Sequence, residues 1–260
     1  MNKTTKISII TINLNNKEGL RNTIESVMSQ TFTDFELIVI DGDSTDGSQE
    51  LINENSESIS FWISEKDVGV YEAQNKGICA AKGKYCLFLN SGDIFYRNDA
   101  LSRVNPYLSE LEVYYCDVML VYNQNHKEIK KHPEDNLLYF LSYEMICHQG
   151  IFFRTDILLR MNLFSLSYTY CSDYELLIRL VLDSKIKLKK VNEIVSEFDM
   201  QGMSNRMENG AKIQLEKKRI WSLLISDSIN ELIQKLHETK LDNSFWYHFR
   251  KMSNLFFKRG

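Results

Sequence analysis

Four short apolar segments near the start of the chain alternate with segments of helical spacing, and this alternation constrains the fold more than any other feature. The apolar segments are residues 7–12, 35–40, 59–63 and 85–89. Short apolar runs rich in β-branched and aromatic residues are typical of strands buried on both faces of a parallel sheet. Between them, apolar residues recur at helical spacing over about 17–30, toward 51–52 and over 71–81. The alternation predicts right-handed βαβ units in an α/β fold.

Each predicted strand ends in a polar loop, and the loops after the second, third and fourth strands carry acids. The loop residues are Thr11 and Asn13, Asp41–Asp46, Glu65–Gly69 and Asn90–Asp93. The carboxyl ends of parallel strands lie along one edge of a sheet, where open α/β sheets bind ligands. Solvated loops would explain the composition too, but not the placement of acids after three successive strands. We therefore expect the acids to line one shared edge.

The loop Asn90–Asp93 follows the apolar strand 85–89 and is the centre of this interpretation. Gly92 would let the backbone come close to a ligand, because glycine has no side chain. Asp93 would offer a hard oxygen ligand to a divalent cation. Taken alone, these residues fit a plain strand-to-helix turn with Asp93 as a cap or turn former. The other acidic loops favour the ligand site.

Less regular elements follow the first four strands. They are a helix over 98–108, a strand over 112–122, a turn at 123–126 that leads into a polar strand, an apolar strand at 151–153, a helix that begins at Ser172-Asp173, and strands at 186–188 and 194–198. From residue 211 onward the pattern is helical only. We expect an α/β domain over residues 1–205 and a helical C-terminal extension over 206–260.

The segment from Ser244 to the C-terminus combines aromatic and basic residues. The apolar face carries Phe245, Phe249, Met252 and Phe256, and the basic residues are Arg250, Lys251, Lys258 and Arg259. No acid follows Asp242. A helix of this composition is typical of a membrane interface. A helix docked on the domain, with its basic residues in solvent, is the alternative.

Composition excludes several classes of protein. The chain has 260 residues, 43% of them hydrophobic, and a formal charge of -4, so it lacks the basic field of a nucleic-acid-binding protein. Its five cysteines form no CxxC pair and indicate reduced cysteines in a cytosolic protein. No run approaches the roughly 18 apolar residues of a membrane span. The short apolar run from Ile7 is a strand, not a signal peptide.

Familiar motifs of other families are absent. The stretch Asp41–Gly47 does not fit an EF-hand, because Asp46 occupies the glycine position and Ile52 the position of the final glutamate. The sequence has no GxGxxG after its first strand, no Walker A sequence and no GxSxG motif. The five histidines lack metal-pair spacing.

Several stretches together carry a family resemblance. They are ISIITIN (7–13), the SVMSQTF and FELIVIDGDSTDGS run (26–48), SEKDVGVYEAQNKGICAAKGKYCLFLNSGD (64–93), HQGIFFR (148–154) and SDYELLIRL (172–180). In this order and spacing, the sequence resembles the family 2 inverting glycosyltransferases that build bacterial O-antigens and exopolysaccharides. The resemblance covers most of residues 6–204. It differs from many relatives in having fewer acids at Asn90–Asp93, and Ser172 where they carry an acid.

The resemblance implies a GT-A fold, which is a mixed, mainly parallel sheet flanked by helices. It also implies a nucleotide-sugar site whose residues are Thr11, Asn13, Asp41, Asp67, Asn75, Lys76, Asn90, Ser91 and Gly92. Within that site Thr11 and Asn13 would border the nucleotide, Asp41 would hydrogen-bond the uracil, and Asp67 would assist at the base or ribose.

Three further roles follow from the same resemblance. Asp93 would hold Mn²⁺ or Mg²⁺, His148 and Gln149 would face the donor or acceptor sugar, and Asp173 would be the catalytic base. The metal would neutralise the leaving diphosphate, and the base would take the proton of the acceptor hydroxyl. By spacing alone, an acid at a helix N-terminus explains Asp173 better than a base does, and the resemblance is what favours the base.

The expected function is therefore metal-assisted transfer of a hexose, glucose or galactose, from a UDP-sugar with inversion. The expected acceptor is a sugar on a polyprenyl diphosphate at the cytoplasmic membrane surface, where the protein would be peripheral. We expect no nucleic-acid partner and leave a homodimer open.

Two other functions remain as alternatives. A sugar-phosphate nucleotidyltransferase would need a glycine- and arginine-rich loop with a lysine after the first strand, and Thr11–Asn16 has neither. In a non-catalytic glycan-binding or scaffold protein, the acidic edge would be incidental. Titration of UDP with and without Mn²⁺ separates the scaffold from the enzyme.

Overall fold

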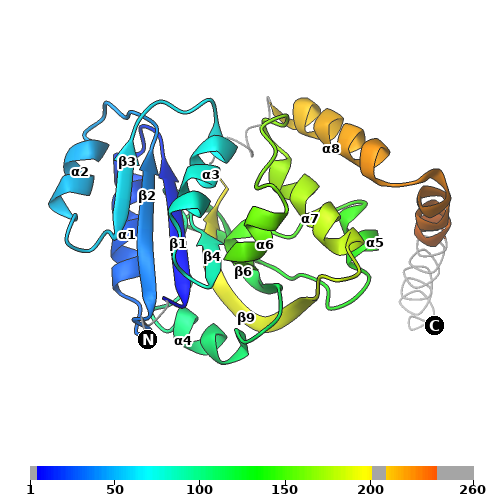
Figure 1. Cartoon of the computed structure of the whole chain (residues 1–260), viewed down its shortest axis with the longest axis horizontal. Helices are drawn as coiled ribbons and strands as arrows, with labels where there is room; N and C mark the ends of the chain where they lie inside the picture. Colours follow the sequence, from blue (N-terminus) through cyan, green and yellow to red (C-terminus); the bar gives the residue numbers. More distant parts are fainter. Residues whose placement is uncertain (1–4, 201–208, 239–260) are drawn as a thin grey trace, which may run out of the picture. The chain divides into compact units, whose positions relative to one another are not determined.

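The computed structural model describes residues 5–200 and 209–238 (Figure 1). Its first elements alternate as predicted: β1 (Ile7–Asn13), α1 (Lys17–Met28), β2 (Phe35–Asp41), α2 (Ser48–Glu54), β3 (Phe61–Ser64), α3 (Val70–Ala80) and β4 (Tyr85–Phe88). Strands β1 to β4 pair in parallel, with β1 between β2 and β4. In this register Asn13 lies beside Asp41, and Asp41 beside Ser64, so three strands end side by side.

The remaining elements complete a mixed sheet. They are β5 (Ile94–Phe95), α4 (Ala100–Val104), a 3₁₀ helix (Asn105–Tyr107), β6 (Val113–Asn123), β7 (His126–Lys130), α5 (Leu137–Leu141), a 3₁₀ helix (His148–Gly150), β8 (Ile151–Arg154), α6 (Thr155–Arg160), α7 (Ser172–Leu182), β9 (Leu188–Asp199) and α8 (Gly210–Leu224). Within the described residues, nine strands form one sheet of order β3-β2-β1-β4-β8-β6-β9-β5, with β7 paired to β6. The α/β prediction is confirmed.

Strand β8 joins the two halves of the sheet. It runs antiparallel to both β4 and β6, so that Phe153 pairs with Cys86 on one side and with Val113 on the other. The 3₁₀ helix that carries His148 and Gln149 precedes β8 directly. Because β8 lies next to β4, this short helix is brought to the loop after β4.

Several predicted boundaries differ from the structure. The strands predicted at 186–188 and 194–198 are one strand, β9, whose pairing with β6 shifts register near Asp117. A register shift of this kind breaks the apolar alternation, which explains the apparent gap. The helix predicted over 98–108 is α4 followed by a 3₁₀ turn that contains Pro106, because proline cannot donate the helical hydrogen bond. Helices α5 and α6 and strand β5 were not predicted.

The hydrophobic core lies under the parallel strands. All seven residues of β1 are buried, and Leu20, Ile24 and Val27 of α1 pack in the same cluster. Burial of one such aliphatic side chain stabilises the fold by about 1.5–3 kcal/mol. Both faces of β1 are therefore buried, which is why its sequence shows no alternation of apolar and exposed polar residues.

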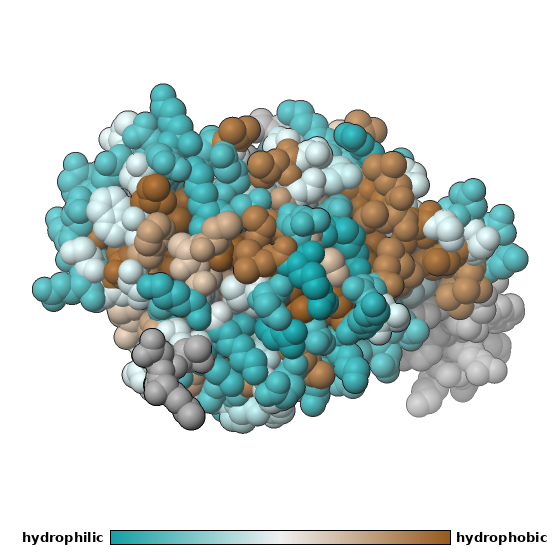
Figure 2. Space-filling model, in the orientation of Figure 1, coloured by the Kyte–Doolittle hydropathy of each residue, from teal (hydrophilic) through white to brown (hydrophobic). Residues whose placement is uncertain are grey.

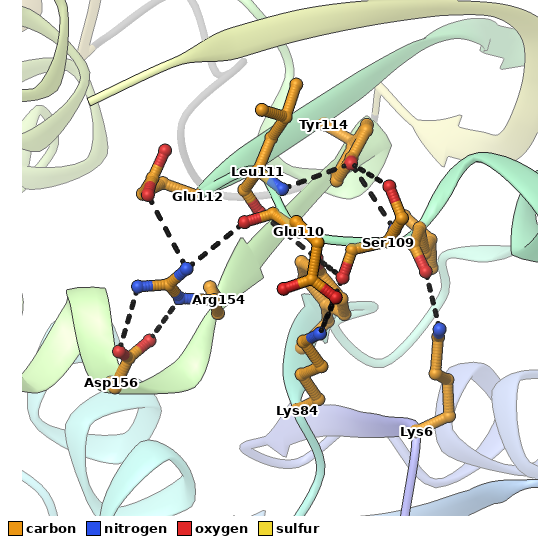
Figure 3. Close-up of polar contacts among 11 residues, drawn as sticks. Lys6, Lys84, Ser109, Glu110, Leu111, Glu112, Tyr114, Arg154 and Asp156 are labelled. Carbon is orange, nitrogen blue, oxygen red and sulfur yellow. Dashed lines mark hydrogen bonds and ion pairs between the residues drawn. The ribbon is translucent and has the colours of Figure 1, made fainter. Parts of the chain in front are cut away.

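The sheet edge at the start of β1 and β4 is fastened by polar contacts (Figure 3). Lys6 and Lys84 donate to the carbonyls of Leu108 and Ser109, at the end of the segment that precedes β6. Arg154 binds Asp156 at 2.6 Å and Glu112 at 3.4 Å. These pairs are partly exposed and each contributes little to stability, but together they fix the loop against the sheet.

A buried carboxylate stabilises the same edge. Glu36, near the start of β2, is 7% exposed and accepts hydrogen bonds from Ser8 Oγ at 2.6 Å and from the amides of Lys82 and Gly83 at 2.6 and 3.0 Å. A Cβ on Gly83 would lie 2.5 Å from the Ser8 amide nitrogen, so only glycine fits this turn. Glu36 thus ties the turn between α3 and β4 to the adjoining strands.

The chain divides into two compact units, residues 1–217 and 218–260. In the second unit, residues 227–238 are helical. The predicted boundary between residues 205 and 206 stays a prediction. The predicted membrane-interface helix over 244–260 lies outside the described residues.

The described surface is mixed in character. On the face that Figure 2 shows, hydrophobic and hydrophilic areas are interspersed. Across residues 5–200 and 209–238, no helix combines the length and the apolar character needed to cross a membrane. The five cysteines are all free, as the sequence predicts.

Candidate active site

Asp41, the last residue of β2, is the centre of a buried hydrogen-bond network. Its Oδ1 accepts from Asn13 Nδ2 at 2.8 Å and Ser44 Oγ at 2.6 Å, and its Oδ2 accepts from the Ser44 amide at 2.9 Å and Ser64 Oγ at 2.6 Å. Asp41 is fully buried. One carboxylate therefore joins the ends of β1, β2 and β3. The side-chain oxygen Oδ1 of Asn13 is buried and has no partner within the protein.

Asp67 lies beside this network, in the loop after β3. Its Oδ2 is 3.5 Å from the position that a Cβ on Gly42 would occupy, so Asp67 adjoins the residue that follows Asp41. Lys76 of α3 binds Asp67 at 2.5 Å and Glu65 at 2.7 Å. The predicted acids after β2 and β3 thus lie at the same part of the sheet edge. Lys76 partly neutralises the acids after β3, which are Glu65 and Asp67.

Two apolar side chains are exposed in the same loops. Leu14, directly after β1, is 60% exposed, and Val68, after β3, is 92% exposed. The Leu14 side chain lies 3.2 Å from the position of a Cβ on Gly42. Polar groups and uncovered apolar groups therefore occur side by side, which is typical of a small-molecule site.

The loop Asn90–Asp93 is held against β1 and α1. The Ser91 amide donates to the Ile12 carbonyl at 3.0 Å, and the Gly92 amide donates to Thr23 Oγ1 at 3.1 Å. Gly92 has φ +106°, a conformation that favours glycine because it lacks a Cβ. The loop after β4 therefore lies at the same edge as the loops after β1, β2 and β3.

Asp93 is buried inside this loop, with an exposed fraction of 3%. It accepts hydrogen bonds from Gln149 Nε2 at 3.1 Å, from the Asn90 amide at 3.2 Å and from the Asp199 amide at 3.1 Å. Burial raises the pKa of Asp93 from 3.8 to about 6, and His148 and these hydrogen bonds partly oppose the rise. Ionised Asp93 is thus a buried negative charge that a cation would stabilise.

Asp199, the last residue of β9, brings a second carboxylate to the loop. Its Oδ2 lies 3.3 Å from the position that a Cβ on Gly92 would occupy. The carboxylates that could hold a metal here are those of Asp93 and Asp199. Among residues 5–200 and 209–238, no three His, Cys, Asp or Glu side chains are arranged to hold a metal alone. Two carboxylates fit Mg²⁺ or Mn²⁺ that is held jointly with substrate phosphates.

Asp173, at the start of α7, is bonded to His148 and Tyr71. His148 Nδ1 lies 2.9 Å from Asp173 Oδ2, and the Tyr71 hydroxyl lies 2.9 Å from Oδ1. Burial, reinforced by the Asp173 charge, raises the pKa of Tyr71 well above its ordinary value, so this hydroxyl remains a donor. His148 Nε2 in turn lies 3.4 Å from Asn90 Nδ2, which links this cluster to the loop after β4.

Most of the predicted residues come together in this way, but the side chains of Thr11 and Asn75 share no hydrogen bond with them. Thr11 is fully buried within β1, and its hydroxyl has no partner in the protein. Asn75 uses its side chain to bond the backbone of Phe164, with distances of 2.8 and 2.9 Å. Asn75 therefore positions α3 against the segment before α7. Lys76 is engaged by Asp67 and Glu65, as described above.

Sequence analysis missed three residues of this site. Asp199 is an acid at the carboxyl end of a strand, and the search for such acids that found Asp41 and Asp93 could also have found it. Tyr71 and Gln74 gave no signal, because at helical spacing in α3 they resemble ordinary helix positions. Their partners, Asp173 and Asn90, come from other elements, and only the folded chain brings them together.

A separate hollow of about 410 Å³ lies away from these residues. It is lined by Tyr96, Arg97, Asp117, Lys131, Lys190, Asn192, Glu193 and Ile194. Lys190 already binds Asp117 at 3.0 Å and the His132 carbonyl at 2.6 Å, so the hollow holds a structural ion pair. None of the predicted site residues lines it.

The loops after β1, β2 and β4 lie along one edge of the sheet, and Asn90 links the loop after β4 to the His148–Asp173 pair. Residues 8–170, more than half of the chain, match the family described as Glycosyl transferase family 2. The chain belongs to glycosyl transferase family 2. The predicted family is thereby confirmed, and the chain is a glycosyltransferase.

Two relatives of this glycosyltransferase are bacterial enzymes. A PGL/p-HBAD biosynthesis glycosyltransferase of Mycobacterium tuberculosis is 30% identical over 205 residues, which are 76% of this chain and 78% of the relative. The UDP-Glc:alpha-D-GlcNAc-diphosphoundecaprenol beta-1,3-glucosyltransferase WfgD of Escherichia coli is 27% identical over 221 residues, 84% of this chain and 85% of WfgD.

Solved structures share the fold of this glycosyltransferase. TarS 1–349 of S. aureus matches with a TM-score of 0.61 at 18% identity, over 75% of this chain and 60% of that chain. The mannosyltransferase PcManGT from Pyrobaculum calidifontis, solved with GDP-Man and Mn²⁺, matches with a TM-score of 0.58 at 14% identity, over 74% of this chain and 56% of that chain. This chain therefore spans less than two thirds of either solved chain. The shared sheet and flanking helices confirm the predicted GT-A fold.

Proposed function

We propose that this glycosyltransferase transfers a hexose, glucose or galactose, from a UDP-sugar to a lipid-linked sugar, with inversion at the anomeric carbon. The observation that carries the proposal is the single sheet edge that joins Asp41, the loop Asn90–Asp93 and the His148–Asp173 pair. A UDP-sugar consists of a nucleoside, a diphosphate and a sugar in that order. Its binding needs three adjoining sites, and we assign them to Asp41, the loop Asn90–Asp93 and the His148–Asp173 pair.

The nucleoside would bind at the Asp41 end of the edge. The unpartnered side-chain oxygen Oδ1 of Asn13 would accept a hydrogen bond from a base, and exposed Leu14 and Val68 would cover its ring faces. The uracil preference is supported by WfgD, whose name includes UDP-Glc, and by S. aureus TarS, which has been solved with UDP and with UDP-GlcNAc.

A divalent cation would bind at Asp93 and Asp199. Mn²⁺ or Mg²⁺ there supplies charge neutralisation for the leaving diphosphate. The protein contributes one buried and one half-buried carboxylate, and the hydrogen bond from the Asp199 amide keeps the two segments in register. Gln149 orients Asp93 from the opposite side.

The chemistry of inversion needs a base on the acceptor side of the donor sugar. Asp173 and His148 form a titratable pair, and Asn90 connects this pair to the loop after β4. Asp173 would drive removal of the acceptor proton while the hydroxyl attacks the anomeric carbon. A single displacement of this kind inverts the configuration.

The acceptor would be a sugar on a polyprenyl diphosphate. WfgD, by name, glucosylates GlcNAc on diphosphoundecaprenol, and this supports the same acceptor class here. The protein would then work in the cytoplasm as a peripheral protein at the inner face of the membrane. The aromatic and basic sequence after Ser244 supports such a location.

Calorimetric titration of UDP tests the donor assignment. We expect Mn²⁺ to tighten UDP binding by at least about tenfold relative to binding in EDTA, because Asp93 and Asp199 would hold a cation that neutralises charge on the diphosphate. GDP is the control nucleotide and should bind more weakly. If UDP does not bind, or binds without metal linkage, the glycan-binding scaffold becomes the better assignment. A panel of UDP-sugars, scored by UDP release, then identifies the hexose.

A further inference from the structure

Glu216, on α8, binds three consecutive backbone amides that lead into α7. Its Oε1 accepts from the Thr169 amide at 2.8 Å, and its Oε2 accepts from the amides of Tyr170 and Cys171 at 2.9 and 3.0 Å. A backbone amide can only donate and an ionised carboxylate can only accept, so the direction of all three hydrogen bonds is fixed. Asp173 lies two residues further along, in the first turn of α7. A side chain of α8 therefore holds the segment that directly precedes Asp173.

Two further contacts dock the start of α8 on the same segment. The Tyr170 hydroxyl donates to Asn209 Oδ1 at 3.0 Å, and the Cys171 thiol donates to the Ile213 carbonyl at 3.6 Å. All of these residues lie within residues 1–217, which form one compact unit. Because these two contacts do not involve Glu216, a substitution of Glu216 should leave α8 docked.

Lys217, the next residue of α8, contacts the chain on the other side of Asp173. Its Nζ lies 5.2 Å from the centre of the Tyr174 ring, which is a cation–π contact. The Tyr174 amide donates to Asp173 Oδ1 at 2.9 Å, and the Tyr174 hydroxyl donates to the Leu141 carbonyl at 2.7 Å. Two neighbouring residues of α8 thus contact the chain before and after Asp173.

The Tyr71 hydroxyl connects the segment that Glu216 holds to the Asp173 carboxylate. It lies 2.8 Å from the Tyr170 carbonyl oxygen and 2.9 Å from Asp173 Oδ1. Tyr170 is therefore held at its amide by Glu216 and at its carbonyl by Tyr71. A shift of residues 169–171 would move both the start of α7 and the hydroxyl that orients the carboxylate. A misplacement of about 1 Å in a reacting group can lower a rate by about 100-fold.

We propose that Glu216 is a positioning residue for Asp173, so that the start of α8 takes part in sugar transfer. The inference rests on the proposed function, which assigns Asp173 as the base, and deepens it by naming the side chain that fixes where this base stands. Glu216 acts through the backbone of residues 169–171 and does not itself contact the substrate. A residue with a purely structural role would change the amount of folded protein but not the turnover of each folded molecule.

The first experiment compares Glu216→Ala, which removes all the acceptor oxygens, with Glu216→Gln, which keeps one. Turnover is UDP release from the UDP-sugar that wild type uses, with a GlcNAc diphospholipid as acceptor, divided by the concentration of UDP sites that calorimetry finds in Mn²⁺. It should fall by about 30-fold or more in Glu216→Ala and by about 5- to 10-fold in Glu216→Gln. UDP affinity should stay within about twofold of wild type. Gln214→Ala, at an exposed residue of the same helix, is the matched control and should keep full turnover.

The second experiment tests whether the carboxylate group itself holds the segment. In Glu216→Ala, three successive amides face the space that the side chain leaves, and successive backbone amides bind small anions. Added formate should therefore raise the turnover of Glu216→Ala by at least about fivefold over sodium chloride at the same ionic strength. Formate should not change the turnover of wild type or of Asp173→Asn. Equal turnover of Glu216→Ala in formate and in chloride would contradict the positioning role.

Asp173→Asn separates the failure of this inference from the failure of the proposed function. As the base, Asp173 should cost about 100-fold or more in turnover when it is replaced by Asn. If Asp173→Asn stays within about threefold of wild type, the proposed base is wrong and this inference fails with it. If Asp173→Asn loses turnover while Glu216→Ala stays within about threefold of wild type per UDP site, the inference alone is wrong. Fewer UDP sites with full turnover per site would mean that Glu216 only stabilises the fold, which also overturns the inference.

Discussion

The Tyr71 hydroxyl on α3 donates a 2.9 Å hydrogen bond to Asp173 Oδ1 at the start of α7. The Tyr71 ring also packs 5.5 Å from the Phe164 ring, centre to centre, and Asn75 bonds the Phe164 backbone twice. The Tyr71 ring contact and the Asn75 hydrogen bonds thus hold α3 against Phe164, and they fix Tyr71 where it contacts the Asp173 carboxylate. The position of this carboxylate depends on α3 as much as on α7.

Tyr71→Phe removes this hydrogen bond and keeps the ring. We expect turnover to fall by about tenfold, the effect of one hydrogen bond to a charged group, while UDP affinity stays unchanged. Initial rates and UDP calorimetry on the same preparation measure the two effects. Tyr107→Phe, at a tyrosine that is 46% exposed, is the control. Unchanged turnover, or a parallel loss of UDP affinity, would contradict the assigned role.

Asp199→Asn tests the second carboxylate of the proposed cation site. We expect the Mn²⁺-dependent gain in UDP affinity to shrink by about tenfold, because the amide removes one charge from the donor set. UDP affinity in EDTA should not change. Asp135→Asn alters an exposed acid near Tyr115 and should leave both affinities at the wild-type value. A full Mn²⁺ effect in Asp199→Asn would remove this residue from the site.

Asp93 should make stability depend on pH in the metal-free protein. Its pKa is about 6 in the folded state and 3.8 in its ordinary state, so the folded protein holds this proton more tightly than the unfolded chain. The contribution of Asp93 is therefore most favourable below about pH 4 and declines as pH rises through about 6. The decline is on the order of 3 kcal/mol.

Urea unfolding in EDTA across this pH range measures the effect. Asp93→Asn cannot ionise, so the free energy of unfolding of wild type minus that of Asp93→Asn should decrease from about pH 4 to about pH 7. The same difference for Asp135→Asn should show no such decrease. A difference that is flat or rises with pH would mean that burial does not raise the pKa of Asp93.

Glu36→Ala should destabilise the fold although Glu36 lies away from the candidate active site. The substitution leaves Ser8 Oγ and the amides of Lys82 and Gly83 without their acceptor. We expect a loss of about 2–4 kcal/mol in the free energy of unfolding, measured with urea. Glu57→Ala, at an exposed glutamate, should change it by less than about 0.5 kcal/mol. A loss below about 1 kcal/mol in Glu36→Ala would show that water replaces the carboxylate.

The part of the fold that could be predicted from sequence is the part with local signals. Strands β1 to β4 are short apolar runs, and topology alone brings their carboxyl ends to one edge, so the neighbouring positions of Asn13, Asp41 and Ser64 follow from the parallel register. Strand β9 was divided in two because its register shift interrupts the pattern of buried residues.

The contacts within the candidate site depend on pairings that no local pattern encodes. Gln149 reaches Asp93 only because β8 enters the sheet antiparallel to β4. Likewise, Tyr71 and Asp173 are 102 positions apart in sequence. The family resemblance supplied expected roles for Asp93, His148 and Asp173, but not the hydrogen bonds that set their protonation and orientation.

Strand β2 carries Glu36 near its entrance and Asp41 at its exit, and this arrangement matters for engineering. The entrance carboxylate secures a turn that lies away from the candidate active site, while the exit loops carry residues of that site. Grafting exit loops from other members of the family should therefore change substrate choice while the anchored rear of the sheet continues to support folding.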